Sequence, residues 1–233
     1  MNNQHTSHTV RAYSDELNAL SDEIARMGGL CESQVSDCIS AVMRRDPALA
    51  EQVIEGDHQV DALETATEKR VIRMLALRQP MASDLRATIA AYRISGDLER
   101  IGDLAKNIAR RTQELNKSEP LELTRSVERM GKLVVSNLHR ILDAFSAGSA
   151  EEAVAVCRAD EEVDEHYNSL FRELLSFMIE DPRTFTASTH LLFVAKNLER
   201  IGDHTTNIAE MIHYLVTGNE LHRDIRRDPD DVA

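Results

Sequence analysis

The sequence is poor in the residues that build β-rich folds. Among 233 residues it has five phenylalanines, four tyrosines and no tryptophan, with only nine glycines and five prolines. Sandwiches and barrels need β-branched and aromatic strands joined by many turns, so this composition argues against both. No apolar run approaches the roughly 18 residues of a membrane-spanning helix, and residues 1–10 lack the apolar core of a secretory signal.

Cysteine and positive charge are also scarce. The three cysteines, Cys31, Cys38 and Cys157, are an odd number without metal-ligand spacing. They indicate reduced thiols in a cytoplasmic protein and not a disulfide framework. Lys and Arg total 27 against 40 Asp and Glu, which gives a net charge of −13. Such a chain is poorly suited to nucleic acid, whose phosphates need a basic face, and better suited to cations or basic partner surfaces.

Apolar residues recur at helical spacing along nearly the whole chain. Near the N-terminus the apolar residues follow one another in steps of three or four, which predicts a first helix over about 8–45. They are Tyr13, Leu17, Leu20, Ile24, Met27, Cys31, Val35, Cys38 and Val42. Five breaks then divide the chain into six long helices, at Asp46-Pro47, Pro80, Pro120, Gly148-Ser149 and Asp181-Pro182. Long helices with short connections pack as antiparallel neighbours in bundles. The polar residues 219–233 are expected to form a disordered tail.

The chain contains an internal repeat. Residues 97–109 and 197–209 share Leu-Glu-Arg-Ile-Gly-Asp and, after three intervening residues, Asn-Ile-Ala. A weaker similarity relates residues 57–61 to 160–164. Each copy belongs to a unit of three predicted helices. We therefore predict an all-α fold of two tandem, sequence-related three-helix bundles, over 8–116 and 122–217.

Acidic pairs mark both copies. Glu99 and Asp103 are four residues apart, and so are Glu199 and Asp203. Each pair shares one face of its helix, where like charges repel by about 0.2–0.5 kcal/mol. Further pairs lie on the preceding helices, and two asparagines continue the stripes: Asp57 with Asp61, Asp160 with Asp164, and Asn107 and Asn207.

Counting from the helix breaks places these acids at matched levels. Asp61 lies 19 residues before Pro80, and Glu99 lies 19 after it. Asp57 and Asp103 lie 23 residues before and after the same proline. Around Pro182 the corresponding separations are 18 and 17, and 22 and 21. Because both helices have the same rise per residue, four carboxylates in each half fall within one turn of a common level.

We call these groups the first carboxylate set (Asp57, Asp61, Glu99, Asp103) and the second carboxylate set (Asp160, Asp164, Glu199, Asp203). The predicted core seam of the third helix is Leu98, Ile101, Ala105 and Ile108. Since the acidic stripe lies well round from that seam, both stripes are expected at the surface. They are either solvated helix faces or surface metal sites, because clustered oxygen ligands suit Mg²⁺, Mn²⁺ or iron.

The two copies of the motif, each near the end of a three-helix unit, resemble the PhoU family of phosphate-signalling proteins over about residues 14–218. The resemblance implies a cytoplasmic regulator, often a homodimer, and not an enzyme. It implies partners too: the ATPase subunit of a Pst-type phosphate ABC transporter and the cytoplasmic domain of a membrane histidine kinase. Such a regulator represses the phosphate-starvation response and limits uptake when phosphate is plentiful.

The same resemblance implies metal clusters at the repeated motifs, with iron, manganese, magnesium or zinc as the ion. Carried over by position, the first site would use Asp57, Asp61, Glu99, Asp103 and Asn107, and the second Asp160, Asp164, Glu199, Asp203 and Asn207. Asn197 stands where the first copy has Asp97. If that leading carboxylate is a ligand, the second site is poorer by one charge.

Some single residues carry predictions of their own. His204 points about 100° away from Asp203, so it is expected to be a packing or partner residue and not a ligand. Gly102 and Gly202 lie mid-helix, where glycine costs about 1 kcal/mol against alanine. Either a helix crossing or room beside the acidic stripe would explain them. The fifth helix is expected to place Phe171, Phe177 and Met178 in the core.

Two classes of function follow. A regulatory adaptor fits the duplicated motif, the long helices, the acidic surface and a sequence without a recognisable catalytic motif. The alternative is a metal-dependent hydrolase or a metal-storage protein, whose carboxylates would hold two ions about 3.5–4 Å apart.

Overall fold

The computed structural model describes residues 3–78, 82–121 and 123–221, and these residues form helices without any strand. The helices are α1 (Asn3–Arg44), α2 (Pro47–Arg78), α3 (Ser83–Leu115), α4 (Thr124–Ala147), α5 (Ala150–Glu180) and α6 (Phe185–Thr217), with a short 3₁₀ turn, η1 (Pro182–Thr184). The all-α prediction is confirmed. Pro80, residue 122 and residues 222–233 of the expected tail lie outside the described residues.

Local capping explains where the helices begin and end. The Asp46 carboxylate accepts hydrogen bonds from the backbone N–H groups of Ala48 and Leu49, at 2.9 and 3.1 Å, and so caps α2. Helix α4 ends at Ala147 and is followed by Gly148, whose φ of 63° lies in the left-handed region that favours glycine. The Ser149 hydroxyl then accepts from the first turn of α5. The breaks predicted at these positions are therefore confirmed.

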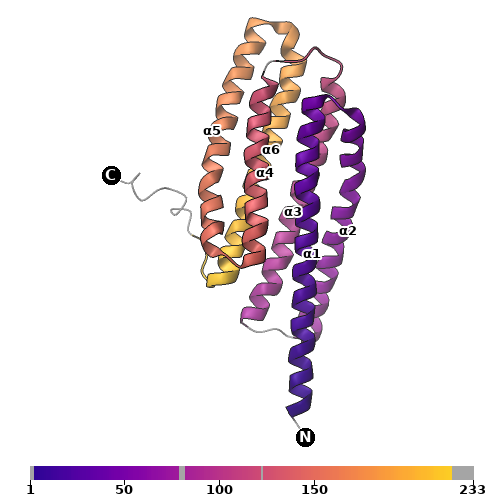
Figure 1. Ribbon diagram of the computed structural model, residues 1–233, viewed down its shortest axis with the longest axis vertical. Coiled ribbons are helices and arrows are strands. Elements are labelled where there is room, and N and C mark those ends of the chain that lie inside the picture. Colours follow the sequence, from indigo (N-terminus) through magenta and orange to yellow (C-terminus); the bar gives the residue numbers. More distant parts are fainter. Residues whose placement is uncertain (1–2, 79–81, 122, 222–233) are drawn as a thin grey trace, which may run out of the picture.

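The two halves of the chain, α1–α3 and α4–α6, are three-helix bundles that lie side by side (Figure 1). Helix α3 of the first half packs against α6 of the second, and α1 also contacts α4. Their apolar seams join in one core, in which Leu98, Ile101, Ala105 and Ile108 are fully buried. None of the described helices has an apolar stretch long enough to cross a membrane.

Helix α5 exposes one apolar residue that was expected to be buried, Phe171, together with two others on the same face. Phe171, Leu175 and Ile179 recur every four residues along α5, and their exposed fractions are 37%, 41% and 81%. Helix α5 packs on α4 and α6 through another face, where Leu170 and Leu174 are buried. The core prediction is therefore wrong for Phe171, while its other two residues, Phe177 and Met178, are half-buried.

Candidate functional site

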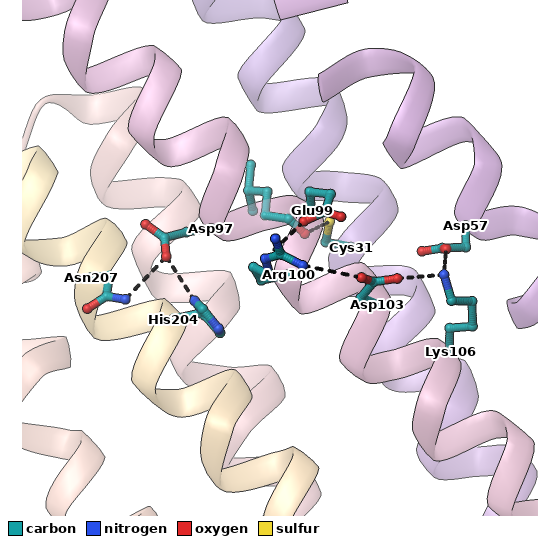
Figure 2. Close-up of polar contacts among 10 residues, drawn as sticks. Cys31, Asp57, Asp97, Glu99, Arg100, Asp103, Lys106, His204 and Asn207 are labelled. Carbon is teal, nitrogen blue, oxygen red and sulfur yellow. Dashed lines mark hydrogen bonds and ion pairs between the residues drawn. The ribbon is translucent and has the colours of Figure 1, made fainter. Parts of the chain in front are cut away.

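The first carboxylate set lies between α2 and α3, and a lysine joins its two helices. The Lys106 ammonium on α3 donates to Asp57 Oδ2 on α2 and to Asp103 Oδ1 one turn away on α3, the latter at 2.5 Å (Figure 2). Asp57 and Asp103 therefore lie at one level, as the count from Pro80 predicts. Lys106 was not predicted, although its place three residues after Asp103 puts it on the same helix face.

Asp57 is buried, which corrects the expectation that both acidic stripes lie at the surface. Its side chain is only 2% exposed. The space comes from Gly102, since a Cβ atom there would lie 3.1 Å from Asp57 Oδ1 and 3.3 Å from Gln34 Oε1. A buried carboxylate is costly unless it is paired, and the Lys106 ammonium supplies the opposite charge. Gly102 therefore makes room beside the acidic residues.

The outer part of the first set is crowded with carboxylates. Arg100 lies 3.4 Å from Glu99 Oε2 and 3.7 Å from Asp103 Oδ2. Burial is the main cause that raises the pKa of Glu99; Arg100 opposes the rise, and Asp103, Asp61 and Glu64 add to it. Burial also raises the pKa of Glu64, with Glu68 and Asp61 adding to the effect. The fold thus holds these acids closer than their charges favour.

The remaining predicted ligands of the first half have weaker contacts. Asp61 is half-exposed on α2, 3.9 Å from His58 Nδ1. Asn107 on α3 accepts a long hydrogen bond of 3.4 Å from Arg110.

The second carboxylate set lies between α5 and α6 and differs from the first. A Cβ atom at Gly202 would lie 2.5 Å from Asp160 Oδ1, so this glycine also makes room for an aspartate of the preceding helix. Glu199 accepts two bonds from Lys196, at 2.5 and 2.6 Å, one turn earlier on α6. Asp164 and Asp203 are exposed. Thr206 occupies the position equivalent to Lys106 in the repeat.

Asp97 lies at the contact between the two halves and not in the first carboxylate set. Its Oδ1 is 2.8 Å from His204 Nδ1 and 3.2 Å from the Asn207 amide nitrogen, both on α6 (Figure 2). His204 is therefore a packing residue at the contact between the halves. The loss of one charge inferred for the second site assumed that Asp97 is a metal ligand, but Asp97 instead bridges the two halves. In the repeat, Asn197 is equivalent to Asp97 and Leu104 to His204, so Asn197 has no histidine to pair with at the equivalent position.

The carboxylates have the right chemistry for a hard cation but not the arrangement. In the described part of the chain, no group of three or more His, Cys, Asp or Glu side chains is placed to hold a metal ion. Lysines bind Asp57, Asp103 and Glu199, which are central to the two predicted ligand sets. As placed, these residues do not fit the metal clusters that the resemblance implies.

Comparisons with known proteins cover nearly the whole chain. A family model described as the PhoU domain matches residues 24–112 and 127–212. A phosphate-specific transport system accessory protein PhoU homolog from Caulobacter vibrioides is 57% identical over 217 residues, 93% of this chain and 94% of that protein. The crystal structure of PhoU from Pseudomonas aeruginosa is similar at a TM-score of 0.87 and 39% identity, over 89% of this chain and 100% of that one. The phosphate transport system regulatory protein PhoU from Streptococcus pneumoniae gives a TM-score of 0.84 at 31% identity, over 90% of this chain and 99% of that one.

Proposed function

Because the chain belongs to the PhoU family, we propose that it is a regulator of phosphate transport. In this role it associates with the ATPase subunit of a phosphate ABC transporter and with the cytoplasmic domain of a membrane histidine kinase. It represses the phosphate-starvation genes and limits uptake when phosphate is plentiful. The observation that carries this proposal is the extent of the similarity, because both halves and 93% of the chain align with a phosphate transport accessory protein.

The arrangement of the carboxylates favours a regulator over the alternative of a metal-dependent hydrolase or metal store. A two-metal hydrolase needs several carboxylates converging on adjacent ions. Here Asp57 and Asp103 share one ammonium, and Glu199 is paired with Lys196. A protein that works through surface contacts needs no such convergence.

The proposal includes a cytoplasmic homodimer as the working form. The chain has a mass of 26.2 kDa. A light-scattering mass near twice this value supports the dimer, and a mass near that of one chain contradicts it.

The regulatory role is tested by deleting the gene in its own organism. In phosphate-rich medium we expect the deletion to derepress a phosphate-starvation reporter and to raise phosphate uptake, and we expect the wild-type gene to restore both. Deleting the kinase as well should abolish the reporter signal while uptake stays high. An unchanged reporter and unchanged uptake contradict the regulatory role, and derepression without the kinase contradicts the kinase link alone.

A further inference from the structure

The cation that completes the first carboxylate set is part of the chain. We infer that Lys106 is the built-in counter-cation of this set, so that the first half of the protein takes up no metal ion there. This inference goes beyond the regulatory role, and it concerns a difference between two halves that share one motif.

The position of the ammonium carries the inference. Lys106 Nζ contacts Asp57 Oδ2 and Asp103 Oδ1, which belong to different helices, and thus lies where a cation bridging α2 and α3 would bind. The lysine side chain is 19% exposed and Asp57 is 2% exposed, so solvent screens the pair poorly. A metal ion on the same two oxygens would lie within a few ångströms of the ammonium and would have to displace it.

The other charges around the set neutralise Asp103, whereas Asp57 has Lys106 on Oδ2 and a buried Oδ1 without a hydrogen-bond partner among the described residues. Asp103 Oδ2 faces Arg100, 3.7 Å away, and Glu99 faces the same guanidinium at 3.4 Å. Both oxygens of Asp103 therefore have a cationic neighbour from this chain.

The second half offers an internal comparison. Thr206 takes the place of Lys106, and its hydroxyl donates to the backbone oxygen of Asp203 at 2.8 Å. It brings no charge to the second carboxylate set. Lys196 binds Glu199 on its own helix, and its side chain is 46% exposed. Lys196 reaches α5 through the ring of Tyr167, 5.3 Å from its ammonium, and a lysine between two aspartates of neighbouring helices is described at Lys106.

The test is a Mn²⁺ titration of the ¹⁵N-labelled full chain, because paramagnetic broadening of amide signals reports where the ion binds. In the wild type we expect the signals of residues 57–61 and 99–107 to stay sharp at one equivalent of Mn²⁺. In Lys106→Gln, which removes the charge, the same signals should be lost. Lys106→Arg keeps the charge and should behave as wild type, and Lys196→Gln is the matched control that should leave these signals sharp.

Two results overturn the inference. One is loss of the first-half signals in the wild type, which means that metal binds beside the lysine. The other is a Lys106→Gln variant as insensitive to Mn²⁺ as the wild type. If Lys106→Gln does not fold in metal-free buffer, its refolding is followed with added Mn²⁺. Recovery supports the inference because the ion replaces the ammonium, whereas failure to recover overturns it.

Discussion

The glycine of the repeated motif provides the sharpest prediction. Alanine at position 202 would favour α6 by about 1 kcal/mol through helix propensity. Its Cβ atom, however, would lie 2.5 Å from Asp160 Oδ1, well inside contact distance. Overpacking of this kind costs about 1–3 kcal/mol, so Gly202→Ala should lower the free energy of unfolding by up to about 2 kcal/mol.

A double-mutant cycle isolates the cause. In an Asp160→Ala background the clash is absent, and Gly202→Ala should then stabilise the protein by about 1 kcal/mol. Gly29→Ala is the control, since Gly29 lies within α1 and a Cβ atom there has no neighbour within 4 Å. It should stabilise by about 1 kcal/mol in both backgrounds. Urea unfolding followed by circular dichroism gives all four values. If Gly202→Ala stabilises the wild type as Gly29→Ala does, the glycine does not make room for the aspartate.

Three further predictions concern pH, the contact between the halves and a helix cap. Burial raises the pKa of Glu99 above 4.5, so the stability that its protonated form contributes is lost as pH rises through that raised value. Glu99→Gln should therefore raise Tm near neutral pH and leave Tm nearly unchanged below pH 4.5. Glu199→Gln should instead lower Tm at neutral pH because it loses an ion pair, and equal shifts would contradict this contrast. Asp97→Asn should cost about 1 kcal/mol by urea unfolding, with smaller cost in a His204→Leu background, and strict additivity would exclude the pairing. Asp46→Ala should cost about 1 kcal/mol through loss of the α2 cap, and an unchanged midpoint would argue against capping.

Much of the fold follows from chemistry that is local in the sequence. The break before α2 depends on an aspartate and a proline at adjacent positions, and the end of α4 depends on Gly148. Capping and positive φ act within a few residues, so the sequence suffices to predict them. The common level of Asp57 and Asp103 was also predictable, because α2 and α3 are joined by one short connection and have the same rise per residue.

The rest depends on packing between helices. Helical periodicity predicts the acidic residues at the surface, but the space left by Gly102 on α3 lets the Asp57 carboxylate enter the interior. The partners of Asp97 lie on α6 in the other half, more than a hundred residues along the chain. Exposure of Phe171 likewise depends on which face of α5 meets its neighbours. Periodicity identifies an apolar face but not the helix that covers it.

The regulatory proposal is tested most directly by measuring whether the purified chain binds the purified ATPase subunit of the phosphate transporter. The ATPase subunit of an unrelated ABC transporter from the same organism is the control. The account predicts saturable binding to the phosphate subunit and none to the control. Absence of binding to the phosphate subunit, or equal binding to both, would contradict a regulator that acts on phosphate transport by direct contact.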